Sequence, residues 1–221
     1  MFTIKVINNQ IKKAKNMSTL LHKFKTIDRK YFYDSLKTKT NLFPKLNQKQ
    51  VDGINSVLDR WDKTKHIDLR WLAYMFATIY HETAKTMIPI EEFGKGKGKD
   101  YGKKLKMSRK PYVTPDKLYY GRGRVQLTWY ENYEKMGKLL GIDLLNHPEK
   151  ALDNDIDVAI LFEGMLKEES NFGDFTGRCL EQYFNDKTED WINARRIING
   201  LDKAELIANY GKEFMKCLKY I

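Results

Sequence analysis

The sequence predicts a mainly α-helical fold with at most a small β element. Apolar residues recur at helical spacing over most of the chain beyond residue 46, and several of these segments begin at a capping residue or end at a glycine. Residues 93–129 break this pattern, with many glycines, lysines and tyrosines. At 221 residues, without an internal repeat or a linker, the chain fits one domain or one domain with a small lobe.

The first two helices are expected between residues 47 and 82. Asn47 can cap a segment whose apolar residues share one helix face; these are Val51, Ile54, Val57, Leu58 and Trp61. Asp68 can cap the next segment, LRWLAYMFATIY, whose wide apolar face predicts a largely buried helix. The last turn of this helix carries His81 and Glu82.

A loop or mobile lobe is expected over residues 93–110, which contain four glycines and eight lysines or arginines. A flexible lid over a cleft is the favoured role for it. Residues 111–129 are rich in tyrosine, proline and β-branched residues and are compatible with a short hairpin.

Helical patterns resume after this region. They cover approximately residues 130–140, 149–170, 176–184, 189–198 and 203–219. Gly141 is expected to end the first of them, and Asp202 with Glu205 forms a capping box for the last.

The distribution of apolar residues bears on where the protein is made. No apolar run is long enough to span a membrane, and the first 16 residues lack the apolar core and cleavage site of a signal peptide. We therefore expect synthesis in the cytoplasm, with Cys179 and Cys217 reduced and partly buried.

The net charge of +11 indicates a polyanionic partner or a tolerance for one. Nucleic acid, an anionic bacterial envelope and a merely solvated lysine surface all fit this charge. The sequence lacks a regular array of aromatic residues for base stacking, so we expect no nucleic-acid partner.

The sequence contains no complete motif for binding a metal ion or a phosphate group. His81-Glu82 begins an HExxH pattern, but its fifth position is Lys85. The glycine–lysine repeat lacks the GxxxxGK[ST] pattern of a phosphate-binding loop. With four scattered histidines and no Cys/His cluster, we expect neither a metal nor a cofactor.

Carboxylates suggest acid–base chemistry. Glu82 ends an apolar helix, where the residues of the preceding turn would disfavour its charged form and keep it protonated near neutral pH. Such an acid, paired with a second carboxylate, is what glycosidic bond cleavage requires. Glu91 and Glu92 follow Pro89 in a loop and are candidates for the second group, with Asp100 as a more distant one.

Three segments resemble glycoside hydrolase family 19, which includes plant-type chitinases and phage endolysins. They are HET at 81–83, YYGRGRVQLTW at 119–129 and RRIING at 195–200, and they occur in the family's order over about 120 residues. The resemblance implies a lysozyme-like, two-lobed helical fold over residues 66–221. Residues 1–65 lie outside it and are expected to form an N-terminal helical region packed on the core.

The resemblance also implies roles for individual residues. Glu82 corresponds to the general acid, and a spacing of ten residues selects Glu92 as the base that activates water, with Glu91 in reserve. Inverting enzymes of this kind need no covalent nucleophile. Thr128 would help to hold the attacking water, although it or Asn132 could instead cap the following helix. The expected sugar-binding residues are Gln126, Asn132, Asn199 and Tyr120, and the expected supporting residues are His81, Arg122 and Arg195.

The function expected from this resemblance is hydrolysis of the β-1,4 bond between N-acetylmuramic acid and N-acetylglucosamine in peptidoglycan. The alternative within the family is a chitinase acting on N-acetylglucosamine polymers. A non-catalytic wall-binding module is the alternative from another class. We expect a monomer without membrane insertion that reaches an anionic bacterial cell wall after release from the cell.

Overall fold

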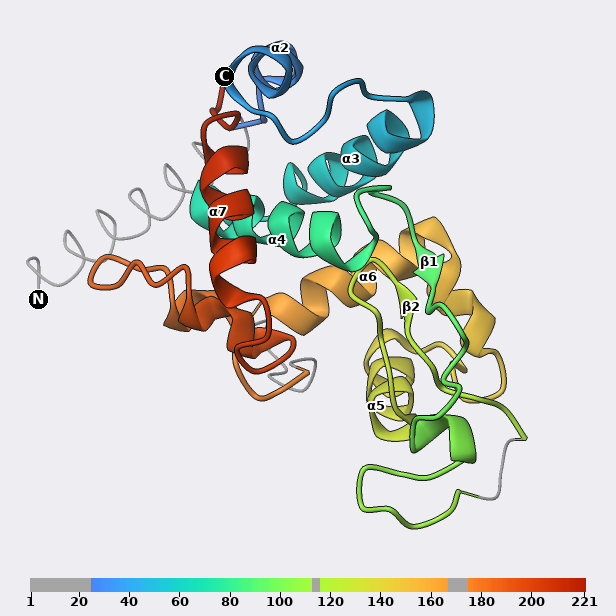
Figure 1. Ribbon diagram of the computed structural model, residues 1–221. Helices are drawn as coiled ribbons and strands as arrows, with labels where there is room; N and C mark the ends of the chain where they lie inside the picture. Colours follow the sequence, from blue (N-terminus) through green and yellow to red (C-terminus); the bar gives the residue numbers. More distant parts are fainter. Residues whose placement is uncertain (1–24, 113–115, 167–174) are drawn as a thin grey trace, which may run out of the picture.

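Helix α4 (Leu69–Glu82) is the central element of the computed structural model, which describes residues 25–112, 116–166 and 175–221. Figure 1 shows α3 (Gln48–Trp61), α6 (Asn154–Met165) and α7 (Ala204–Met215) gathered around it. The side chain of Asp68 accepts a hydrogen bond from the backbone of α4, as its sequence predicts. Every residue of α4 from Leu72 to Tyr80 is buried, so the expectation of a largely buried helix is confirmed.

Aromatic packing joins α4 to α7. The rings of Phe76 and Phe214 stack with their centroids 5.4 Å apart, and Tyr80 meets Phe214 edge-on at 5.9 Å. These large rings bury the apolar face of each helix against the other. The C-terminal end of α4, which carries Glu82, is therefore fixed relative to the C-terminal part of the chain.

The N-terminal described segment packs on the same core. Helix α2 (Arg29–Lys39) buries Phe32 and Leu36, and Asn47 forms a capping box with Gln50 at the start of α3. Ile27 forms a β-bridge with Tyr220, so the segment before α2 lies beside the end of the chain.

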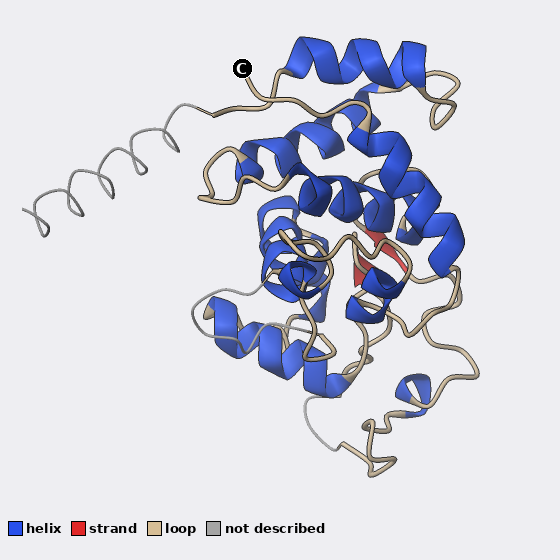
Figure 2. Cartoon of the chain, turned by 90° about the vertical axis from the view of Figure 1, so that its left-hand side faces the viewer, coloured by secondary structure: helices blue, strands red, loops and turns tan. Residues whose placement is uncertain are grey.

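A single two-stranded antiparallel sheet occurs among the described residues. It pairs β1 (Ile90–Glu91) with β2 (Arg122–Gly123), which Figure 2 shows in red among the helices. The hairpin expected within residues 111–129 is therefore replaced by pairing of Arg122 and Gly123 with Glu91 and Ile90, 31 and 33 positions earlier. Among the described residues of 111–129, an isolated bridge joins Arg122 to Leu127. No α-helix of the described residues is both long and apolar enough to cross a lipid bilayer.

A buried ion pair explains why β2 lies where it does. Arg124 and Asp157 are both fully buried and pair with each other, and the backbone N–H of Arg124 also donates to Asp157 at 2.6 Å. The same guanidinium donates to the carbonyl of Met87 and the hydroxyl of Ser56, each at 3.0 Å. One arginine thus joins the end of β2, α3, α6 and the segment before β1. Its burial is tolerated because its charge is balanced by Asp157 and its N–H groups have hydrogen-bond partners.

Gly123 gives this ion pair its space. Its φ of +84° lies in the left-handed region, and a Cβ at this position would lie 2.3 Å from Oδ1 of Asp157. The glycines of the YYGRGRVQLTW motif are therefore required for backbone shape, here by a close approach to a buried carboxylate.

The later helices are shorter than the sequence predicts. Helix α5 (Tyr130–Leu140) ends at Gly141 with φ +66°, as expected, and α6 follows a 3₁₀ helix at Pro148–Leu152. The segments expected to be helical at 176–184 and 189–198 contain only 3₁₀ turns at Leu180–Gln182 and Asn193–Ile197. Residues 167–170 of the helix expected at 149–170 lie outside the described residues.

The capping box expected at Asp202 and Glu205 is wrong. Lys203 precedes α7 in a left-handed conformation, and no side chain caps this helix. The turn before α7 is instead held by Arg195, whose Nε donates to the carbonyl of Asp202 at 2.9 Å. Cys179 and Cys217 are both buried and form no disulfide, in agreement with the expected reduced state.

Candidate active site

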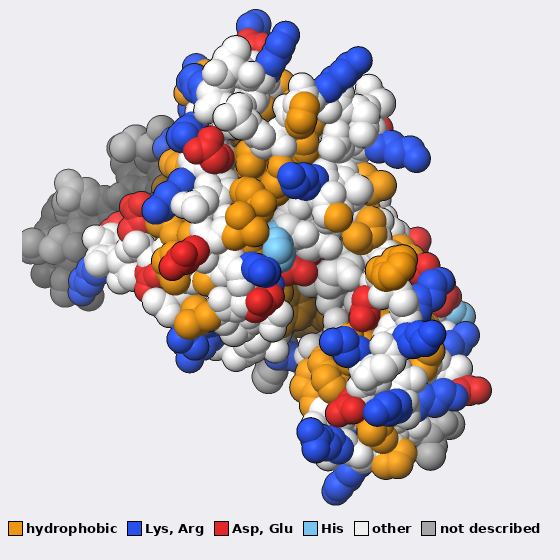
Figure 3. Space-filling view, in the orientation of Figure 1, with side chains coloured by type: hydrophobic (Ala, Val, Ile, Leu, Met, Phe, Trp, Pro, Cys, Tyr) orange, Lys and Arg blue, Asp and Glu red, His pale blue; other side chains and the backbone are white. Residues whose placement is uncertain are grey.

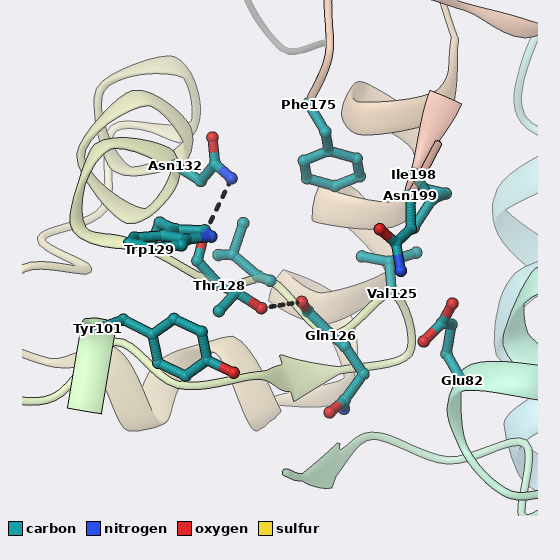
Figure 4. A pocket seen from close by; sticks show the side chains of 11 residues that line it. Glu82, Tyr101, Val125, Gln126, Thr128, Trp129, Asn132, Phe175, Ile198 and Asn199 are labelled. Atoms are coloured by element: carbon teal, nitrogen blue, oxygen red, sulfur yellow. Dashed lines mark hydrogen bonds between the residues drawn. The ribbon is translucent and has the colours of Figure 1, made fainter. Parts of the chain in front are cut away.

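A pocket of about 290 Å³ lies between the end of α4 and the segment that follows β2. Figure 4 shows Glu82 and Asn199 on one side of it and Tyr101, Trp129 and Asn132 on the other. Figure 3 shows a recess between the upper helical body and the lower part of the molecule. The lining residues come from widely separated parts of the chain: Glu82, Tyr101, Val125, Gln126, Leu127, Thr128, Trp129, Asn132, Phe175, Ile198 and Asn199.

Glu82 reaches this pocket from the last residue of α4. Its side chain is 16% exposed, and its Oε1 accepts a hydrogen bond from Nη1 of Arg195 at 2.7 Å. The apolar surroundings expected for this acid are thus only part of its environment, because a buried cation lies against it. A carboxyl group in this position can donate a proton to a bound molecule, and the arginine then stabilises the resulting carboxylate by an ion pair.

Of the two neighbouring arginines, Arg195 is the one that contacts the candidate acid. It is 1% exposed, and the carbonyl of Asp202 fixes its Nε. Arg196 is half-buried and donates to Asn193 at 3.0 Å. Arg195, expected as a supporting residue, is therefore the arginine that contacts Glu82, whereas Arg196 contacts Asn193.

Glu91 and Glu92 point in different directions, since successive side chains in an extended strand alternate. Glu92 accepts hydrogen bonds from the hydroxyl of Tyr101 at 2.8 Å and from the backbone N–H of Gly121 at 2.9 Å. A Cβ added to Gly121 would touch both the side chain of Glu92 and that of Gln126. Glu92 is therefore next to two residues that line the pocket, although it does not itself line it.

Glu91 is held on the other side by cations. Lys95 lies 2.9 Å from its carboxylate, and Nε of Arg122 lies 4.0 Å away. The pKa of Glu91 is lowered, first by the hydrogen bond from Lys95 and then by the hydroxyl of Tyr120. Both partners favour the ionised carboxylate and draw it away from the pocket.

Tyr120 and Arg122 do not line the pocket. Tyr120, expected to bind the sugar, is buried and donates its hydroxyl to Glu91. The guanidinium of Arg122 lies 3.6 Å from the centre of the Tyr120 ring and donates to the hydroxyl of Tyr133. This stack supports the strand behind the site, and the carboxylate nearest to Arg122 is Glu91.

The third candidate carboxylate, Asp100, does not line the pocket. Its side chain is 3.7 Å from Nε of Arg109, in the loop that precedes the 3₁₀ helix η1 (Tyr101–Lys103). Asp100 is therefore the weakest candidate for a base.

Residues 126–132 form one wall of the pocket. Gln126 donates its amide to the carbonyls of Gly123 and Ile90, at 2.9 and 3.2 Å, so its N–H groups brace the two strands. The hydroxyl of Thr128 donates to the carbonyl of Gln126 at 2.6 Å, which leaves its oxygen lone pairs available as acceptors. Asn132 donates to the carbonyl of Thr128 at 2.9 Å.

The wall is built on a strained backbone. Gln126 and Trp129 have φ values of +53° and +77°, which only a few per cent of non-glycine residues adopt. Trp129 occupies the cap position of α5, and no side chain caps that helix. The possibility that Thr128 or Asn132 caps it is thus wrong, and both side chains remain at the pocket. Strain of this kind is characteristic of functional sites.

Asn199 and His81 complete the expected set. Asn199 follows the 3₁₀ helix η4 (Asn193–Ile197), is exposed and lines the pocket beside Glu82. His81 is half-buried, and burial lowers the pKa of its ring; the charge of Glu82 opposes this shift and that of Arg195 adds to it. The imidazole next to Glu82 is therefore biased towards its neutral form.

The sequence-based prediction missed the aromatic residues of the pocket. Tyr101 belongs to the glycine–lysine loop, and its ring meets that of Trp129 at a centroid distance of 5.1 Å. Phe175 lines the opposite edge. Trp129 ends a motif that the sequence does single out, whereas nothing near Tyr101 or Phe175 marks them except that they are aromatic residues in polar, glycine-containing segments.

The part of the chain that contains Glu82 and most of the pocket is similar to a known protein family. Residues 63–168 match the family described as Chitinase class I, Glyco_hydro_19. The chain is 40% identical to Chitinase 4 of Oryza sativa subsp. japonica over 90 residues, which is 40% of this chain and 30% of that protein. It is 57% identical to Inactive chitinase-like protein 1 of Hevea brasiliensis over 35 residues, 16% of this chain and 11% of that one.

The fold is also similar to that of a solved protein. A crystal structure of a chitinase C variant aligns with a TM-score of 0.50 and 20% identity, over 85% of this chain and 74% of that one. The mainly helical fold is thereby confirmed, while the curated relatives are matched over less than a third of their length. The family match over residues 63–168, which contain the HET and YYGRGRVQLTW segments, confirms the resemblance of this chain to glycoside hydrolase family 19.

Proposed function

We propose that the protein is a glycoside hydrolase that cleaves β-1,4-linked glycans containing N-acetylglucosamine by an inverting acid–base mechanism. The observation that carries this proposal is the position of Glu82. A partly buried carboxyl group enters a pocket lined by hydroxyl, amide and aromatic side chains, and Glu92 lies next to two residues of that lining. Polar groups and aromatic rings in this combination suit a sugar, whose hydroxyls form hydrogen bonds and whose faces are apolar.

Each residue has a defined task in this mechanism. Glu82 donates a proton to the oxygen of the leaving sugar, and Arg195 stabilises the carboxylate that results. Glu92 removes a proton from a water molecule as its oxygen attacks the anomeric carbon. Thr128 accepts a hydrogen bond from that water, since its own hydroxyl hydrogen is already donated to Gln126. Asn132 and Asn199 hydrogen-bond the sugar from opposite sides of the pocket.

Chitin is the substrate that the relatives favour. The similar proteins are named chitinases, which supports the chitinase alternative better than the peptidoglycan hydrolase expected from the sequence. Peptidoglycan remains the second candidate because of one feature, the concentration of positive charge beside the pocket. Neutral chitin gives that charge no partner, whereas bacterial walls are anionic.

A paired assay tests the reaction and separates the substrates. The protein is incubated with N-acetylglucosamine oligomers and with purified bacterial walls, and new reducing ends are measured. Glu82→Gln is the control, because the amide keeps the side-chain volume but cannot donate the proton. Its activity on the preferred substrate should fall by about 10²–10⁴-fold at a temperature where circular dichroism shows the variant to be folded. Near-normal activity of a folded Glu82→Gln variant would exclude Glu82 as the acid.

A further inference from the structure

More than half of the chain's net charge lies on one side of the pocket. Residues 93–112, named here the basic lobe, contain eight lysines or arginines and one aspartate, a net charge of +7 out of the +11 of the whole chain. Figure 3 shows blue side chains gathered over the lower part of the molecule, where Figure 1 places this green segment. Such a local excess raises the concentration of anions next to the surface.

The basic lobe is a chain of hydrogen-bonded turns. The backbone N–H groups of Lys95, Lys97 and Lys99 each donate to the carbonyl three residues earlier, at 3.1, 2.9 and 3.0 Å. The alternating glycines between them have φ values near +80° and permit this repeat. Consecutive turns therefore present lysines along an exposed edge.

Several of these lysines are without an internal partner. Lys95, Lys104 and Arg109 form ion pairs with Glu91, Asp116 and Asp100. By contrast, four exposed lysines of the lobe have no ion pair among the described residues; they are Lys97, Lys99, Lys103 and Lys110. Phe93, at the start of the lobe, is fully exposed. Charges that neutralise nothing within the protein are available to an external anion.

The lobe is continuous with the pocket. It begins directly after Glu92, and its residue Tyr101 both lines the pocket and donates to Glu92. The ring of Tyr101 packs on Gly96, where a Cβ would lie 3.1 Å from it, and Gly102 crosses the backbone of Gly96 too closely to allow a side chain. A glycan bound in the pocket therefore brings whatever is attached to it against the lysines.

We propose that the basic lobe binds an anionic polymer that carries phosphodiester groups and is attached to the cell-wall glycan. This inference rests on the proposed function in one respect only: it takes the glycan bound in the pocket to be that of a bacterial cell wall. Lysines spread along a turn, rather than converging on a pocket, match a polymer with repeating charges and no fixed sequence. A nucleic acid fits less well, because Phe93 is a single exposed ring and not a series of stacking platforms.

The test measures binding and not cleavage, so that it succeeds or fails independently of the proposed reaction. All variants carry Glu82→Gln, and co-sedimentation is measured with purified Gram-positive walls, with the same walls after hydrofluoric acid has removed phosphodiester polymers, and with chitin. The lobe variant replaces Lys97, Lys99, Lys103 and Lys110 with glutamine. A matched control variant replaces four exposed lysines far from the lobe, Lys37, Lys45, Lys49 and Lys65, and therefore has the same net charge.

The proposal predicts a specific pattern. The parent protein should bind intact walls, and raising salt from 50 to 200 mM should weaken this binding by roughly 50- to 150-fold, the effect of about four screened contacts at the salt slopes of nucleic acids. The lobe variant should bind intact walls at least about 10-fold more weakly than the control variant at low salt. On stripped walls and on chitin the two variants should bind equally.

Other outcomes overturn the proposal. Equal losses in both variants would show that only the total charge matters. A difference that persists on stripped walls or on chitin would place the lysines on the glycan itself. Binding of the lobe to double-stranded DNA more tightly than to intact walls, lost in the lobe variant, would identify nucleic acid as the partner.

Discussion

Arg195 places its Nη1 2.7 Å from Oε1 of Glu82 and joins the end of α4 to a segment 113 residues later. The guanidinium is 1% exposed and is also fixed by the carbonyl of Asp202. The candidate acid is therefore positioned by a buried cation that comes from the segment just before Asn199, on the same side of the pocket. The two groups must be treated as a unit in any account of the chemistry.

Arg195→Lys should lower the rate of glycan cleavage by roughly 10²-fold, since a lysine cannot contact Asp202 and Glu82 at the same time and the acid loses its position. Turnover of N-acetylglucosamine oligomers as a function of pH measures this, because a shift of the acidic limb accompanies a changed environment of Glu82. Arg196→Lys is the matched control and should leave the rate and the pH profile unchanged. A rate for Arg195→Lys equal to that of Arg196→Lys would show that the contact has no part in catalysis.

Glu92→Gln should reduce activity by about 10²-fold or more, whereas Glu91→Gln should reduce it far less. The physical reason is the alternation of the strand: Glu92 lies beside Tyr101 and Gln126, and Glu91 is paired with Lys95. Initial rates on the preferred substrate and melting temperatures of both variants provide the comparison. The reverse order of rates would make Glu91 the base, and mild effects of both would direct attention to Asp100.

Gly123→Ala should destabilise the protein by roughly 3 kcal/mol or more, because the new methyl group would overlap Asp157 and the left-handed backbone would be strained. Gly141→Ala is the control for strain alone, since its φ is +66° with open space around it, and it should cost about 1–2 kcal/mol. Urea unfolding of the three proteins gives the free energies. Equal losses for the two substitutions would show that Asp157 tolerates the methyl group.

The stability of the protein should decrease on acidification, in part because of His81. Its pKa in the folded protein is lowered by burial, so between the ordinary value of 6.5 and that lower value only the unfolded chain binds the proton. The contribution of neutral His81 to the free energy of unfolding is therefore fully present above pH 6.5 and is lost as the pH falls through the pKa of His81 in the folded protein. His81→Gln lacks the proton-binding group. As the pH falls from 7.5 to 5, the free energy of unfolding of the variant should therefore rise relative to that of the parent. A stability difference that is independent of pH would contradict this assignment.

The sequence by itself determined the helices that carry their own signals. Asn47, Asp68 and Gly141 mark helix ends through local hydrogen bonds and backbone conformation, and the apolar face of α4 predicts its burial. The three family segments likewise identified Glu82, Gln126, Thr128 and Asn199, and the resemblance extends to Asn132 just after the second segment; the structure brings all five together in one pocket. These features depend on neighbours in the chain, or on motifs that can be read in order.

Only the tertiary structure decided the relations between distant residues. The pairing of β1 with β2, the contact of Arg195 with Glu82, and the separation of Glu92 from Glu91 all depend on which segments meet in space. The same holds for Tyr101, which reaches the pocket only because the basic lobe folds back on Gly96. Residues 176–198 keep a helical pattern in sequence but form short 3₁₀ turns, because packing against the core outweighs weak local preferences.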